Sequence, residues 1–61
     1  MKVIKLINSS RGWLARFEDD EEIIKNFGTD TIPTAFTEKA SPMMVMAEIQ
    51  KRNPNSLVVF A

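Results

Sequence analysis

The residues that could perform chemistry are few, and the clearest group lies in a threonine-rich segment. Asp30 stands between Thr29 and Thr31, so its carboxylate could act as a base on a neighbouring hydroxyl nucleophile. Such a pair normally needs a third group that orients the base, and the sequence shows none. The Gly-x4-Gly-Lys pattern of a phosphate-binding loop is also absent. We therefore expect local side-chain-to-backbone hydrogen bonds here, and no enzyme activity.

A second group is the run of five acidic residues at positions 18–22. Clustered carboxylates are the ligands that magnesium and calcium prefer, but the alternating spacing of an EF-hand loop is missing. Acidic residues at a helix N-terminus instead cap free amide groups and interact favourably with the helix dipole. We expect a solvated helix start, with no bound metal and no cofactor.

The composition removes further classes of function. The 61 residues carry eight basic and eight acidic side chains, and they include no His and no Cys. Disulfides, thiolate metal sites and cysteine nucleophiles are therefore excluded, and the commonest general base is missing. The hydrophobic content of 44% is typical of a folded domain, and no apolar run reaches the roughly 20 residues that span a bilayer. We expect one cytoplasmic domain over residues 1–61, with no membrane contact.

The uneven placement of charge raises nucleic-acid binding as an alternative function. The first 17 residues carry four basic side chains and no acidic one, and basic groups interleaved with aromatic rings are typical of nucleic-acid surfaces. Four cations are few for phosphate binding, and the acidic run can pair with them instead. The candidate contacts of this alternative are Lys2, Lys5, Arg11, Arg16 and Trp13.

The methionines favour contact with another protein. Met43 and Met44 fall on or near the polar side of a predicted helix, whereas Met46 falls on its apolar side. Flexible methionine is over-used at binding surfaces, and an exposed apolar patch on a small protein usually marks a partner site. The competing interpretation is that Met43 covers loop residues 32–36. The predicted partner-binding residues are Met43, Met44, Thr31, Pro33, Thr34 and Phe36.

The N-terminal third of the chain predicts a β-hairpin that would carry the basic residues. Residues 2–8 are rich in β-branched side chains, and residues 13–18 alternate between apolar and mixed positions. Gly12, in the turn between them, can take a positive φ. On the second strand the core candidates are Trp13, Ala15 and Phe17.

A short helix and a long loop are expected next. Asp19 and Glu22 have the spacing of a capping box, and Gly28 is a natural stop, which together predict a helix over residues 19–27. Residues 28–41 keep neither helix nor strand periodicity, so they predict an irregular loop. Loops of this length are often functional, which agrees with the partner-binding interpretation.

The C-terminal part predicts a helix and a strand. Ser41 followed by Pro42 is typical of a helix N-terminus, and the pattern continues to about Arg52. Residues 56–61 are almost wholly apolar and predict a strand that is covered on both faces. The helix positions expected to face the core are Val45, Met46 and Ile49.

These elements predict a small two-layer α+β domain of order β-β-α-loop-α-β. We expect a three-stranded sheet of order 2-1-3, with both helices on one face and the third strand antiparallel to the first. The other face would then show apolar side chains such as Val3 and Ile7. A domain of this size without disulfide or metal needs either very good packing or self-association for its stability, and a second copy is the simplest cover for that face. The predicted function is a non-enzymatic, homodimeric protein-interaction module, with nucleic-acid binding as the alternative.

Overall fold

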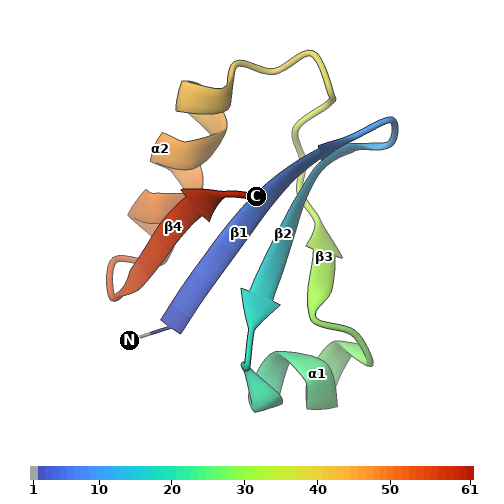
Figure 1. The fold of residues 1–61 in the computed structure, drawn as a ribbon, viewed down its shortest axis with the longest axis vertical. Coiled ribbons are helices and arrows are strands. Elements are labelled where there is room, and N and C mark those ends of the chain that lie inside the picture. The colour runs from blue at the N-terminus through green and yellow to red at the C-terminus, as the bar shows by residue number, and fades with distance from the viewer. Residues whose placement is uncertain (1) are drawn as a thin grey trace.

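The computed structural model describes residues 2–61 and shows one four-stranded sheet with two helices (Figure 1). The small mixed α+β class is therefore as the sequence predicts. Neither helix of the described residues has the length and apolarity that crossing a bilayer requires. In chain order the elements are β1 (Lys2–Ser9), β2 (Gly12–Glu18), α1 (Glu21–Phe27), β3 (Thr31–Pro33), α2 (Pro42–Arg52) and β4 (Ser56–Phe60).

The predicted hairpin is confirmed, and it supplies most of the core. Strands β1 and β2 pair antiparallel, with Ile4 opposite Phe17 and Leu6 opposite Ala15. These side chains share the face that α2 covers, because residues directly opposite one another point to the same side of a sheet. Val45 of α2 is fully buried against this face. The buried core consists of Ile4, Leu6, Trp13, Ala15, Val45 and Val58.

The segment predicted as an irregular loop contains a strand, β3. It pairs antiparallel with β2 and places Ile32 opposite Ala15. The amide of Phe17 donates to the carbonyl of Asp30 at 2.7 Å, so even-numbered residues of this segment direct their backbone toward β2. The backbone of Pro33 points away from β2. Its lack of an N–H group therefore removes no hydrogen bond from the pairing of β3 with β2. This arrangement explains why a proline does not prevent the pairing.

The predicted sheet of three strands in the order 2-1-3 is wrong, because the observed order of the four strands is β3-β2-β1-β4. The predicted direction of the last strand is also wrong, since β4 runs parallel to β1. The additional strand accounts for this reversal. Strand β3 carries the chain back along the sheet, α2 returns it to the starting end, and β4 must then run in the direction of β1 (Figure 1).

Helix α1 begins one residue later than the capping box predicts. The N-cap is Asp20, whose side chain accepts a hydrogen bond from the Ile23 amide, whereas Asp19 adopts a positive φ of 52°. Burial acts to raise the pKa of Asp20. The Ile23 amide, the Lys2 ammonium 3.2 Å away and the Glu22 amide outweigh that effect, so the pKa lies below the ordinary 3.8. The predicted stop at Gly28 is confirmed, with φ of 74°.

The two helices differ in how much of the sheet they cover. Helix α2 begins at the predicted Ser41–Pro42 step and lies against β4 and β1, with Met46 and Ile49 packed on the core. Helix α1 contains no buried residue and lies at the end of the sheet where β2 ends (Figure 1). The expectation that β4 is covered on both faces is wrong, since Leu57 and Phe60 are exposed. Strand β4 forms an edge of the sheet, which leaves part of it uncovered.

Candidate functional site

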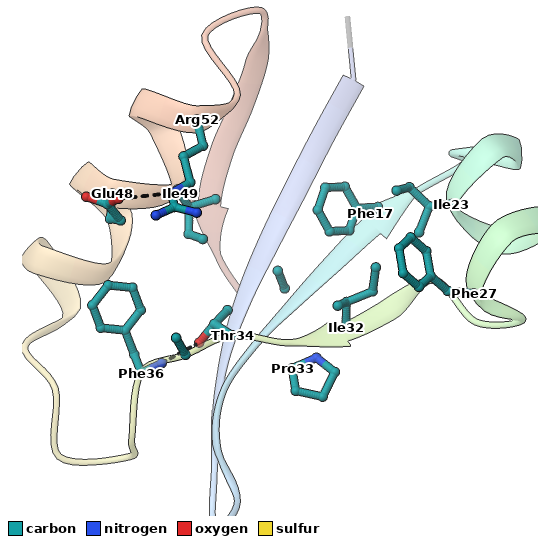
Figure 2. A pocket seen from close by; sticks show the side chains of 12 residues that line it. Phe17, Ile23, Phe27, Ile32, Pro33, Thr34, Phe36, Glu48, Ile49 and Arg52 are labelled. Atoms are coloured by element: carbon teal, nitrogen blue, oxygen red, sulfur yellow. Dashed lines mark hydrogen bonds and ion pairs between the residues drawn. The ribbon is translucent and has the colours of Figure 1, made fainter.

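An open hollow of about 460 Å³ lies between α1 and α2, on the sheet face that carries the core (Figure 2). Its volume falls within the range of roughly 300–1,000 Å³ that is typical of ligand sites. Its lining is largely apolar. The lining residues are Ala15, Phe17, Ile23, Phe27, Ile32, Pro33, Thr34, Ala35, Phe36, Glu48, Ile49 and Arg52.

The hollow exists because the sheet is wider than one helix. Four strands spaced about 4.8 Å apart make a face roughly 19 Å wide, whereas one helix with its side chains covers about 10–12 Å. Helix α2 covers the β4–β1 half of the sheet, and the seven residues of α1 are too few to cover the β2–β3 half. The floor of the hollow is formed by the half-buried side chains of Phe17 and Ile32 (Figure 2), beside Ala15, which is buried in the core.

The two side walls come from the helices. Ile23 and Phe27 are four residues apart on α1, so they lie on the same side of that helix and face the hollow. On α2 the wall is formed by Glu48, Ile49 and Arg52. The Glu48 carboxylate accepts a hydrogen bond from Arg52 Nε at 2.9 Å, and both side chains are exposed, so this pair is screened by solvent.

The segment after β3 closes the third side of the hollow through hydrogen bonds to Trp13. Thr34 donates from its amide and from its hydroxyl to the Trp13 carbonyl, at 2.9 and 2.7 Å. The Trp13 amide donates in turn to the Phe36 carbonyl at 3.0 Å. Gly12 takes the predicted positive φ, at 107°, and it has a second role. A Cβ there would lie 2.7 Å from the Phe36 carbonyl oxygen, so only glycine allows this approach.

The predicted partner-binding residues divide into three groups. Pro33, Thr34 and Phe36 line the hollow, whereas Thr31, Met43 and Met44 do not. Thr31 lies in β3, and its hydroxyl donates to the Asp30 carboxylate at 3.0 Å. The remaining two candidates are the exposed methionines of α2.

Met43 is 70% exposed and Met44 is 57% exposed, so neither is covered by the domain itself. Met44 precedes Glu48 by four residues, and it therefore extends the side of α2 that borders the hollow. Met43 lies about 100° further round the helix, directed away from the hollow. Of the two methionines, only Met44 is placed to contact a molecule bound there.

The candidate nucleic-acid residues do not form one basic surface. Three of the four cations lie in ion pairs with acidic side chains: Lys2 with Asp20, Lys5 with Glu18, and Arg16 with Asp30. Arg11 is exposed in the turn between β1 and β2. Trp13 is 4% exposed and its indole N–H donates to the Ala40 carbonyl at 3.2 Å, so its ring offers no stacking surface. Nucleic-acid binding stays a prediction, which a mobility-shift assay at low salt would test.

The threonine-rich segment makes the local hydrogen bonds that the sequence predicts. The Thr31 amide donates to the Thr29 hydroxyl at 3.2 Å, and Asp30 lies 3.5 Å from Arg16 Nε. These contacts occupy the groups that were considered as a base and a nucleophile. Within residues 2–61 no cluster of three or more acidic side chains is arranged to hold a metal ion.

Sequence reasoning did not identify most of the lining of the hollow. Ile23 and Phe27 are recognisable as the apolar positions of a short helix, but the pattern does not tell which part of the sheet they face. Phe17 and Ile49 are recognisable as core candidates, and they line the hollow as well as the core. The helical spacing of Glu48 and Arg52 was the available signal for the ion pair.

Comparison of the chain with protein-family models, with curated proteins and with solved structures gives no match. The site offers apolar contacts, the exposed Glu48–Arg52 ion pair and the free backbone edge of β3. Thr34, the one lining residue with a hydroxyl group, already donates it to the Trp13 carbonyl.

Proposed function

We propose that this chain is a non-enzymatic protein-interaction module, which binds an amphipathic helix of another protein in the hollow between α1 and α2. The observation that carries the proposal is the apolar hollow itself, in which Phe17 and Ile32 of the floor are only half-buried and Phe27 of one wall is 61% exposed. Apolar side chains of this size are usually covered, and a large uncovered patch usually marks a partner site.

A helix is the occupant that fits the dimensions of the open area. The uncovered half of the sheet is about 10 Å wide, which is the width of one helix with its side chains. Such a helix would present apolar residues at positions i, i+3 and i+4 to the hollow, as in other helix-in-groove complexes. Its binding would bury Phe27, which is 61% exposed at one wall, and Met44 beyond the other wall.

The polar groups at the margin would orient the bound helix more than hold it. The Glu48–Arg52 pair is exposed, so it contributes direction and specificity and adds little to affinity. The fixed segment of Thr34 to Phe36 would set the limit of the hollow at its third side, because its hydrogen bonds to Trp13 hold it in place. The binding free energy would come mainly from burial of apolar surface.

The experiment uses a designed helical peptide library and the intact protein. Peptides of about 16 residues, with varied residues at i, i+3, i+4 and i+7, are displayed and selected for binding. The best peptide is synthesised and titrated while backbone amide shifts are recorded by NMR. The proposal expects the largest shifts at Phe27, Ile32 and Phe36. Shifts centred on the opposite sheet face, or no selected helical peptide, would reject it.

Two methionine variants give a matched control. Met44→Lys places a charge beside the hollow, and Met43→Lys places the same charge one residue earlier on the exposed side of α2. The selected peptide should bind the Met44→Lys variant roughly ten-fold or more weakly and bind the Met43→Lys variant almost unchanged, because burial of one apolar side chain changes affinity by about that factor. Equal effects of both substitutions would contradict the assignment of the site.

A further inference from the structure

Helix α1 carries a second apolar surface that the hollow does not use. Ile24 is 46% exposed and does not line the hollow, and the neighbouring Phe27 is 61% exposed. Helix α1 contains no buried residue, and Ile24 keeps nearly half of its surface exposed. Ile24 lies outside the hollow, and with the outer part of Phe27, which lines the hollow, it forms an apolar surface on α1 that contact with another molecule would cover.

The charges beside Ile24 are arranged to match their own copy. Glu21 and Lys25 are four residues apart, and helical spacing places both on the same side of Ile24. When two copies of a helix pack antiparallel about a two-fold axis, this side of one copy faces the same side of the other in reversed order. Glu21 of each copy then lies beside Lys25 of the other. Among residues 2–61 none of the four ion pairs uses either side chain.

We infer that two copies of this chain associate through antiparallel contact of their α1 helices, with Ile24 at the centre and reciprocal Glu21–Lys25 pairs beside it. The contact is distinct from the proposed binding of a partner helix, although Phe27 lies at the margin of both. Because α1 is only about 10 Å long, the contact area is smaller than that of a stable dimer. The association is therefore weak and depends on protein concentration.

The charge pattern favours α1 over the open sheet face as the surface for self-association. At the centre of that face Lys5 lies directly opposite Arg16 across the β1–β2 ladder. Both cations are already paired within one copy, Lys5 with Glu18 and Arg16 with Asp30, so stacking two copies on this face needs no new ion pair at its centre. On α1 a two-fold axis brings Glu21 of one copy beside Lys25 of the other.

The test measures mass by sedimentation velocity over protein concentrations from about 10 µM to 1 mM, where a small interface is expected to associate. The wild-type chain should approach the mass of a dimer with rising concentration. Ile24→Lys should weaken the association by roughly ten-fold or more, and Met43→Lys should leave it unchanged. Circular dichroism establishes that each variant is folded. A wild-type chain that stays monomeric up to 1 mM overturns the inference.

Two charge variants test the antiparallel arrangement itself. Glu21→Lys gives each copy two cations beside Ile24, and Lys25→Glu gives each copy two anions. Each variant alone should lose dimerisation, and an equimolar mixture of the two should regain it as a heterodimer. A mixture that stays monomeric while the wild-type chain dimerises would show that another surface is used. A negative result in these dimerisation tests does not bear on the proposed peptide site, because peptide binding to the Ile24→Lys variant tests the hollow separately.

Discussion

Replacement of Gly12 by alanine should destabilise the domain strongly, although alanine adds only one carbon atom. The new Cβ would lie 2.7 Å from the Phe36 carbonyl oxygen, whereas ordinary contacts begin near 3.4 Å. The carbonyl must therefore move by several tenths of an ångström, which weakens its hydrogen bond from the Trp13 amide by up to about 1 kcal/mol. The φ of 107° adds strain of about 1–3 kcal/mol for a residue with a Cβ. The sum is about 3 kcal/mol.

Urea unfolding followed by the fluorescence of the single tryptophan, Trp13, measures this effect. Gly28→Ala is the matched control, because Gly28 also has a positive φ, of 74°, but a Cβ there meets no atom within 4 Å. Its expected loss is about 1 kcal/mol, which is the penalty of the left-handed conformation alone. If the two substitutions destabilise equally, the close approach of the Phe36 carbonyl does not limit position 12, and the reasoning is refuted.

Three further predictions concern the cap and the core. The folded-state pKa of Asp20 lies below 3.8, so the stability that this carboxylate contributes is present above that pH and is lost as the pH falls through the lowered pKa. Asp20→Asn should therefore reduce the loss of stability at acid pH, measured as the urea midpoint from pH 2 to 6. Trp13→Phe removes a buried indole and its hydrogen bond, and should lower stability by about 2 kcal/mol in thermal unfolding. Val45→Ala should lower it by about 2 kcal/mol, whereas Met43→Ala should change it by less than about 0.5 kcal/mol in the same assay.

The elements with strong local signals were predictable from the sequence. The hairpin follows from alternating β-branched and aromatic residues around Gly12, and α2 follows from Ser41 and Pro42 at its start. These signals act within a few residues of the chain, so a single sequence contains them. The same is true of the stop at Gly28. The exposure of Met44 also follows from helical spacing alone, whereas Met43 lies at the edge of the predicted polar side, where spacing does not decide.

Strand β3 was not predictable in the same way, because its reason lies elsewhere in the chain. Three residues with a proline have no periodicity to recognise, and their pairing depends on the free edge of β2. Because β3 was not predicted, the expected direction of β4 was also wrong. Each added strand reverses the direction in which the chain runs, so β4 is parallel to β1. The hollow depends on both of these facts, since Ile32 forms part of its floor. The residues that line the hollow could therefore be named only in part.

The length of α1 connects the two proposed surfaces. Asp20 fixes the beginning of this helix and Gly28 fixes its end, so only seven residues are helical. A helix as long as α2, with eleven residues, would extend about 6 Å further and could cover more of the β2–β3 half of the sheet. The short α1 instead leaves the hollow open on one side and Ile24 exposed on the other. Phe27 borders both surfaces, so a bound partner helix and the α1 contact between copies should compete, and added peptide should shift the dimer toward monomer in the sedimentation assay. An unchanged dimer fraction at saturating peptide would show that the two surfaces act independently.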